Sequence, residues 1–411
     1  MNPEERMRLT ILPALRAATV AALLLLLAAC AADDRAAAPF TVRDSAGIRI
    51  MESAVPAWAP EDAWRLAAEP AVVIGAVEGS PAYLLEQVSG IVILPDGAVV
   101  VADRRASNLR WFDEAGRHMR TVGGRGAGPG EFQFLTGLFP LNEDTLAAVD
   151  ATQRRTTLIT ADGQVVGTEE LAPVGRLDDG RWIHATAIQP PGEQRLGLAR
   201  YGLAMLGSNS GAAAVDTLAL LPGSDILFVE QDMGSGVQVV GMPMPYGSHT
   251  LVRPWGDAIM VADGSSYQLS RFDGSGTLRQ IARRTLRRTP LTEEVRTRYR
   301  ENELARVPAE RRPSLEHRHD QLVFPDSFPS WQELRMDRQG RAWARHFPLP
   351  GDTVQSWSVF DPDGRWLGEV QMPSDLTVRD IGYGWVAAVW RDELDVAHVR
   401  IYRLDGFQEV R

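Results

Sequence analysis

DGAVVVADRRASNLRWFDEAGRHMRTV, residues 96–122, recurs as EDTLAAVDATQRRTTLITADGQVVGTE at 143–169 and as GDAIMVADGSSYQLSRFDGSGTLRQIA at 256–282. In each copy an apolar run ends in an aspartate, an apolar residue follows nine positions after it, and a glycine follows thirteen positions after it. Because these three positions match in all three segments without a gap, the segments are copies of one repeat. The matching residues are Asp103, Phe112 and Gly116, then Asp150, Ile159 and Gly163, then Asp263, Phe272 and Gly276.

Each copy has the pattern of short strands separated by tight turns. In the first copy, residues 98–101 are an apolar run, residues 109–112 are a second strand after a polar loop, and turn residues bound both. The apolar residues 89–94 precede this copy and supply a further strand. A unit of four strands is the size of one blade of a β-propeller.

Weaker copies bring the number of blades to six. Phe360 and Tyr402 each lie four residues before a glycine, as Phe112 does, whereas the segment from Val174 has an Asp-Gly turn but breaks the spacing. We therefore predict an all-β chain that forms one six-bladed propeller over residues 48–411. The predicted blades lie near residues 83–125, 133–171, 174–221, 248–284, 331–373 and 376–406.

The last predicted blade lacks a fourth strand, because the repeat stops near residues 401–404. Residues 64–75 look like a lone strand that needs partners. Pairing this strand with the last blade would close the ring and cover two exposed strand edges. We predict that closure.

Two segments exceed the repeat, at residues 225–246 and 285–330. The first contains Gly-Ser-Gly and is predicted to be a protruding hairpin. In the second, Thr292 can cap a helix that begins with Glu293 and Glu294, two acids that suit its positive end. We therefore expect a short helical insertion between blades 4 and 5.

The first copy continues into VGGRGAGPGEF at residues 122–132. This loop, together with VVVADRRASNLRWFDEAG before it, resembles the repeats of NHL-type six-bladed propellers. From about residue 64 to 406 the chain resembles the six-bladed propeller lipoproteins of bacteria. The resemblance implies a fold and not one activity, since such rings include binding modules, lactonases and lyases.

Residues 1–29 have the three parts of a secretion signal: arginines, an uncharged stretch and small residues before the cut. The uncharged stretch Ala17–Ala29 is shorter than the ~20 residues that a membrane-spanning helix needs. Cys30, the only cysteine, follows Leu-Ala-Ala directly, and this sequence resembles the lipobox of bacterial lipoproteins. The resemblance implies that Cys30 becomes lipid-modified and attaches the protein to a membrane.

Residues 30–47 are predicted to be a tether and entry segment behind that lipid. In the lipoprotein family an aspartate after the cysteine favours the inner membrane, but here Ala31 follows. The resemblance therefore implies an outer-membrane position that faces the periplasm. The translation start is open between Met1 and Met7, because starting at Met7 would remove two acids from the leader.

Histidine and aspartate side chains are the candidates for metal binding. His317 and His319 would face the same way on a strand, which could suit zinc or copper, but their surroundings are rich in arginine and proline. The recurring aspartates either ring a channel as cation ligands or cap their own turns. Four further histidines could converge near the axis: His184, His249, His346 and His398. We therefore assign no metal site. His317 and His319 are kept only as candidate ligands.

Residues 283–318 hold eleven arginines and six glutamates, although the chain has a net charge of -10. This segment is either a solvated helical excursion or a docking surface for an anionic ligand, a lipid headgroup or a partner. The candidate binding residues are Arg296, Arg298 and Arg300.

The acidic balance argues against nucleic-acid binding. A nucleophile elbow is absent, because Asn209 stands where the serine would be in Gly207–Gly211, and we assign no catalytic residue and expect no cofactor. We predict an envelope-anchored lipoprotein that acts as a non-enzymatic propeller module and binds a ligand or protein. The alternative is a metal-assisted hydrolase, lactonase or lyase with its site at the propeller axis.

Overall fold

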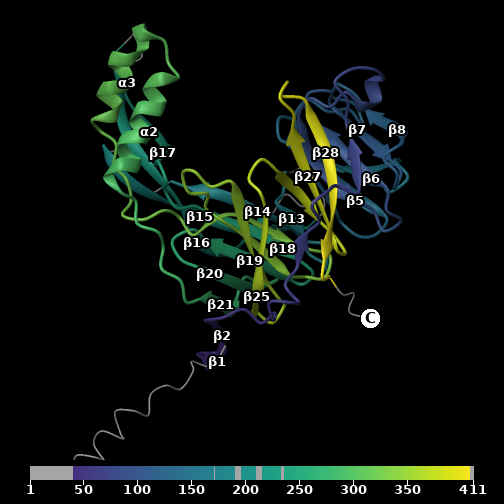
Figure 1. Ribbon diagram of the computed structural model, residues 1–411, viewed down its shortest axis with the longest axis horizontal. Helices are drawn as coiled ribbons and strands as arrows, with labels where there is room; N and C mark the ends of the chain where they lie inside the picture. The colour runs from purple at the N-terminus through teal and green to yellow at the C-terminus, as the bar shows by residue number, and fades with distance from the viewer. Residues whose placement is uncertain (1–39, 171, 190–195, 210–214, 233–235, 408–411) are drawn as a thin grey trace, which may run out of the picture.

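The computed structural model describes residues 40–170, 172–189, 196–209, 215–232 and 236–407. Cys30 and the predicted signal of residues 1–29 lie outside the described residues. The described chain is mostly β-strand and forms six sheets in chain order (Figure 1). This is the arrangement of a β-propeller, in which each sheet is one blade.

Four strands make up the first sheet: β5 (Val88–Ile93), β6 (Val99–Asp103), β7 (Asn108–Phe112) and β8 (His118–Gly123). The second sheet contains β9 (Leu135–Pro140), β10 (Thr145–Asp150), β11 (Arg155–Thr160) and β12 (Val165–Glu169). The third contains β13 (Gly175–Arg176), β14 (Trp182–Ile188), β15 (Gly197–Ser208), β16 (Val215–Asp232) and β17 (Val237–Pro243).

The fourth sheet is built from β18 (Thr250–Trp255), β19 (Ala258–Asp263), β20 (Gln268–Asp273) and β21 (Leu278–Arg284), extended by β2 (Ile48–Ser53) and β1 (Phe40–Ser45). In the fifth are β22 (Trp331–Met336), β23 (Ala342–His346), β24 (Val354–Phe360) and β25 (Trp366–Pro373). The sixth combines β26 (Thr377–Ile381), β27 (Trp385–Arg391) and β28 (Ala397–Asp405) with β3 (Arg65–Leu66) and β4 (Val72–Ile74).

The repeated aspartate and glycine have structural roles. The buried carboxylate of Asp103 accepts hydrogen bonds from the backbone N–H groups of Glu86 and Gln87 at 3.0 and 3.2 Å and from Arg105 at 3.1 Å. It thereby joins the end of β6 to the segment that leads into β5. Gly116 has a φ of +77°, in the left-handed region that glycine adopts without strain. The predicted capping role of the recurring aspartates is confirmed at Asp103.

The sixth sheet joins the two ends of the propeller. Strand β4 pairs antiparallel with β28, so that Ile74 lies opposite Val399, and β3 pairs with the end of β28. The blade count predicted this pairing. It covers the outer edge of β28, which would otherwise be an unpaired strand edge.

The hydrophobic core lies between neighbouring sheets. Residues on the facing surfaces of two successive blades form most clusters, such as Trp343 and Trp357 of the fifth sheet with Val378 of the sixth. Similar clusters join the first sheet to the second and to the sixth, the fourth to the fifth, and the third to the fourth. Burying both faces of a blade explains the continuous apolar runs of the repeat, such as residues 98–102.

The entry segment differs from the prediction. Strands β1 and β2 form a hairpin, and β2 pairs in parallel with β21, where Ile50 lies opposite Ile281. The expected tether of residues 30–47 therefore includes a strand from Phe40 onward. The sequence could not show this, because parallel pairing joins residues more than two hundred positions apart and leaves no local pattern.

The third blade also differs from the prediction. Its expected end near residue 221 falls inside β16, which continues to residue 232, and the expected hairpin at 225–246 is the outer part of β16 and β17 in the same sheet. The boundary was wrong because turn residues at Pro222 and Gly223 sit inside a continuous strand, where the register with β15 shifts.

Two helices lie in the chain between β21 and β22: α2 (Glu293–Ala305) and α3 (Arg312–His319). The hydroxyl of Thr292 caps α2 by accepting a hydrogen bond from the backbone N–H of Val295 at 3.4 Å. Figure 1 shows α2 and α3 beside β17 in a projection that extends away from the other sheets. Leu227 and Val229 of β16 and Tyr299 of α2 belong to the cluster that joins helices and sheet. Neither helix is long and apolar enough to span a membrane, and the same is true of every helix among the described residues.

Candidate functional site

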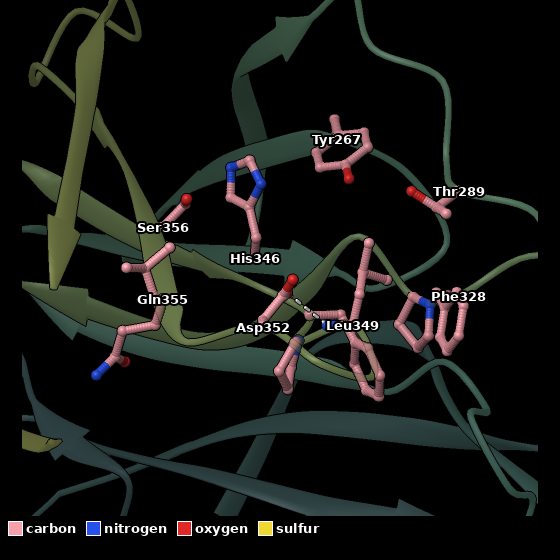
Figure 2. Close-up of a pocket in the computed structure, with 12 residues that line it drawn as sticks. Tyr267, Thr289, Phe328, His346, Leu349, Asp352, Gln355 and Ser356 are labelled. Carbon is pink, nitrogen blue, oxygen red and sulfur yellow. Dashed lines mark hydrogen bonds between the residues drawn. The ribbon is translucent and has the colours of Figure 1, made fainter. Parts of the chain in front are cut away.

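A cavity of about 220 Å³ lies between the fourth and fifth sheets, where the helical insertion returns to the ring. Figure 2 shows its lining side chains. Tyr267 comes from the β19–β20 connection, Thr289 and Phe328 from the two ends of the insertion, and His346 from the last position of β23. The loop after β23 and the start of β24 close the cavity with Leu349, Asp352, Gln355 and Ser356.

Aromatic packing holds the insertion against the ring at this point. The ring of Tyr246 lies 5.1 Å from that of Phe328 and 6.1 Å from that of Phe347, measured between centroids, and 5.7 Å from that of Tyr299 on α2. Phe328 stacks on Phe347 at 5.8 Å and the pair forms an apolar side of the cavity. The cavity therefore depends on the insertion, which the repeat itself does not contain.

Behind His346 is a buried polar network. Its Nε2 lies 2.8 Å from the hydroxyl of Ser358 and 3.2 Å from Nη1 of Arg284. Arg284 Nη1 also donates to Ser358 Oγ and to Glu369 Oε1, both at 2.6 Å, and its guanidinium lies 3.6 Å from the centre of the Trp366 ring. Arg284 is nearly buried, with 6% of its side chain exposed, whereas 31% of the Glu369 side chain is exposed, so water screens this ion pair only in part.

His346 is neutral at pH 7. Burial, assisted by the positive charge of Arg284 and opposed by the carboxylate of Glu369, lowers the pKa of His346 to about 4. The two hydrogens of Arg284 Nη1 go to Ser358 and Glu369, and the Ser358 hydroxyl can donate to Nε2 of His346 or accept from it. The network therefore holds the His346 ring in one orientation through its Nε2.

Hydrogen-bonding groups surround the cavity on the other sides. In Figure 2 the hydroxyl oxygens of Tyr267 and Thr289 point toward the space beside His346. Burial raises the pKa of Tyr267, so its hydroxyl stays protonated. Asp352 accepts a hydrogen bond from the backbone N–H of Leu349 at 2.8 Å, which orders the loop. The cavity combines an apolar side with hydroxyl and amide groups, a neutral histidine and the carboxylate of Asp352.

The predicted binding arginines lie on α2 and are paired along the helix. Arg298 lies 2.7 Å from Glu294, and Arg296 and Arg300 lie 3.5 and 3.7 Å from Glu293. The guanidinium groups of Arg296 and Arg300 also lie over the ring of Phe324. These pairs offset much of the local positive charge. A docking role for the three arginines stays a prediction.

The histidine predictions need correction in their geometry. His317 and His319 lie on α3, not on a strand, so residues two apart point to different sides of the helix. His319 is buried and His317 is exposed. His184 binds the hydroxyl of Ser208 at 3.0 Å and His398 binds Asp392 at 2.9 Å, each within its own blade. Among the described residues, no group of three or more His, Cys, Asp or Glu side chains is placed to hold a metal ion.

Sequence reasoning missed Tyr267, Thr289 and Phe328 as site residues. These side chains come from separate blades and from both ends of an insertion, and no spacing in the sequence connects them. The only local signal was the Pro- and Phe-containing segment from Pro325 to Trp331, where the chain re-enters the ring.

The fold and the comparisons define a six-bladed β-propeller. Residues 77–174 match the model of the DUF5128 family, described as a 6-bladed beta-propeller. No curated protein matches the chain.

Several solved propellers are similar in structure. A putative exported protein from Bacteroides fragilis is 13% identical with a TM-score of 0.47, and the match covers 87% of this chain and 99% of that one. A gluconolactonase from Xanthomonas campestris is 13% identical with a TM-score of 0.39, over 82% and 99% of the two chains. BamB from Moraxella catarrhalis is 12% identical with a TM-score of 0.29, over 88% and 96%.

Proposed function

We propose that this protein is a lipid-anchored binding propeller of the bacterial envelope, and that the cavity beside His346 receives a small neutral ligand. Export, lipid attachment at Cys30 and an outer-membrane position that faces the periplasm are inferred from residues 1–31, which resemble those of lipoproteins. Kinship with NHL-type repeats is part of the same proposal. The ligand-binding role is inferred from the cavity.

The observation that carries the binding role is a neutral histidine, held by a polar network, that lines a cavity built by the insertion. A polar network that holds a neutral histidine at the wall of a cavity is typical of a binding site, where a few polar groups set the orientation of the ligand. The positive charge of Arg284 beneath the cavity is matched by Glu369, so an anion gains little there. Phe328 and Phe347 favour a ligand with an apolar face, such as a sugar ring or a small aromatic alcohol.

A binding role fits the network better than nucleophilic catalysis. Ser358 is the hydroxyl that His346 contacts, and it is fully buried in β24 with an exposed fraction of 0%. A substrate in the cavity therefore cannot reach this hydroxyl. The metal-assisted hydrolase, lactonase or lyase stays an alternative prediction, which elemental analysis of the purified mature protein tests, because a stoichiometric metal would support it.

Binding in the cavity is tested by calorimetric titration with a panel of monosaccharides and small aromatic alcohols. We expect saturable binding of at least one member, weakened roughly 3–10-fold by Tyr267→Phe or by Thr289→Val, because each removes one hydrogen bond to the ligand. Tyr383→Phe is the matched control, since Tyr383 is 48% exposed on the sixth blade. Equal weakening by Tyr383→Phe, or no binding by any member, would reject the cavity as the site.

Lipid attachment is tested separately. We expect Cys30→Ser to abolish incorporation of labelled palmitate and to release the protein from the membrane fraction, because Cys30 is the only thiol. The melting temperature of the Cys30→Ser protein should equal that of the delipidated mature chain, since the described strands begin only at Phe40. Membrane association that survives Cys30→Ser would contradict the anchor.

A further inference from the structure

The innermost strands of the six blades are neighbours around the axis of the ring. Strands β5, β9, β13, β18, β22 and β26 each lie at one edge of their own sheet. Strand β5 lies against both β9 and β26, β22 lies against both β18 and β26, and β18 also lies against β13. Side chains that these strands direct inward therefore meet in one central channel.

Arginine side chains gather in this channel. Arg253 is on β18, Arg335 on β22 and Arg379 on β26. Nη1 of Arg335 donates a hydrogen bond of 2.5 Å to the backbone carbonyl of Arg379, which joins the fifth blade to the sixth. Arg104 directly follows β6, and its guanidinium lies 4.8 Å from the centre of the ring of Phe134 at the start of the second blade.

One carboxylate lies among these arginines. Glu333 binds Arg335 Nη2 at 2.5 Å, and it lies opposite Arg345 in the register of β22 and β23. Burial and the charge of Arg335, opposed by Glu333, lower the pKa of Arg253 to about 10. Burial and the charge of Arg335 lower the pKa of Arg379 as well, with a smaller contribution from Arg104. The five guanidinium groups and Glu333 thus form one electrostatic cluster, the axial arginine cluster.

The axial arginine cluster is incompletely partnered. Its buried Nε atoms without a hydrogen-bond partner are those of Arg104, Arg335, Arg345 and Arg379. Among the described residues, only Arg335 of the five has a carboxylate within 4.0 Å. Four other arginines, each with at most 16% of its side chain exposed, do have such a partner: Arg110 with Asp103, Arg284 with Glu369, Arg338 with Asp380 and Arg341 with Asp337.

This contrast calls for a ligand. Like charges held close together in a partly buried channel repel one another, and a bound group of opposite charge offsets that cost. Low-dielectric walls around a channel also focus the positive potential toward an anion. The cluster can be reached by solvent, since 21% of the Arg335 side chain and 20% of the Glu333 side chain are exposed.

We propose that the axial arginine cluster binds a small oxyanion that carries at least two negative charges, as phosphate or carboxylate groups. The planar guanidinium fork donates two parallel hydrogen bonds to either group, which a point charge cannot do. The positive charge of the five guanidinium groups, less the one negative charge of Glu333, is greater than an ion with a single negative charge can neutralise. This site shares no residue with the cavity beside His346, and its ligand is charged whereas the ligand of the cavity is neutral. The proposal for the axial arginine cluster can therefore fail while the proposal for the cavity holds, and the reverse.

The test uses the mature protein with pyrophosphate, citrate and acetate as probes, at fixed ionic strength. We expect pyrophosphate or citrate, but not acetate, to raise the melting temperature and to bind saturably by calorimetry. A preference between pyrophosphate and citrate identifies phosphate or carboxylate as the natural group. Stabilisation that sodium chloride reproduces at equal ionic strength would overturn the proposal, because it would reflect screening alone.

Two variants sharpen the test. Arg345→Gln and Arg379→Gln each remove an arginine without a carboxylate partner, so we expect an unchanged or higher melting temperature without probe and affinity for the preferred probe weakened about tenfold or more. Arg306→Gln, directly after α2, is the matched control, because it removes the same charge from an arginine that is 75% exposed. Equal loss of affinity in Arg306→Gln, or full affinity in both channel variants, would overturn the proposal. If one channel variant misfolds, the other still decides the outcome.

Discussion

Replacing Arg284 with methionine is expected to lower the free energy of unfolding by about 3–5 kcal/mol, because it leaves Glu369 without its buried partner. Arg284 makes the ion pair with Glu369 at 2.6 Å, donates to Ser358, and packs on the face of Trp366. Methionine keeps part of the contact with Trp366 but supplies no donor. Urea unfolding followed by circular dichroism measures the loss.

The double variant Arg284→Met/Glu369→Leu separates the unpaired charge from the lost packing. It should recover most of the stability, since removing both members of a buried pair costs far less than removing one. Arg306→Met is the exposed control and should change the free energy of unfolding by less than about 1 kcal/mol. A loss in Arg284→Met no larger than in Arg306→Met would show that the network contributes little.

The same variant has a second readout at His346. The charge of Arg284 lowers the pKa of His346, and Glu369 Oε1, only 3.6 Å from its Nε2, raises it. With Arg284 removed and Glu369 retained, the pKa of His346 should rise, which an NMR titration of the ring protons measures. An unchanged pKa would mean that burial alone keeps the ring neutral.

Gly276→Ala is expected to be the second most damaging of the changes considered, at roughly 3 kcal/mol or more in the free energy of unfolding. Gly276 is the repeat glycine of the fourth blade and has a φ of +82°. A methyl group there would collide with the backbone carbonyl of Leu218 on β16 of the third blade. The substitution therefore adds a clash between blades to the cost of a left-handed alanine.

Gly47→Ala isolates the conformational part of that cost. Gly47 has a φ of +77°, in the hairpin between β1 and β2, and a methyl group there would meet nothing within 4 Å. We expect Gly47→Ala to cost about 1–2 kcal/mol. The urea midpoints of Gly276→Ala and Gly47→Ala give the part of the loss that is due to the clash between blades. Equal losses of stability in the two variants would mean that the third blade moves to relieve this clash at no cost in free energy.

The repeat made the blades predictable because the turn caps, the hairpin glycines and the apolar strand pattern of each blade all lie within one short stretch of sequence. Asp103 caps its own turn, Gly116 makes its own hairpin, and the apolar runs bury both faces of their own sheet. Closure by residues 64–75 followed from counting strands. The third blade escaped prediction because its longest strand carries Pro222 and Gly223 in its interior, where turn residues usually mark an end.

The two candidate sites could not be predicted, for a common reason. Tyr267, Phe328 and His346 converge only because the fourth blade, the insertion and the fifth blade lie side by side. Arg253, Arg335 and Arg379 meet only because successive inner strands turn around one axis. Each of these residues looks ordinary in its own strand, and the sequence contains many arginines that are exposed and paired, such as Arg298.

The sequence by itself determined the six-bladed ring, its closure and the predicted lipid site at Cys30, since these depend on patterns within a few tens of residues or on counting repeats. Tertiary structure alone decided that β2 joins β21, that His346 is neutral beside Arg284, and that arginines of several blades share one channel. The physical reason is that burial and charge–charge interaction depend on distances in space. Those distances are set when the blades pack around the axis and are not encoded in any single repeat.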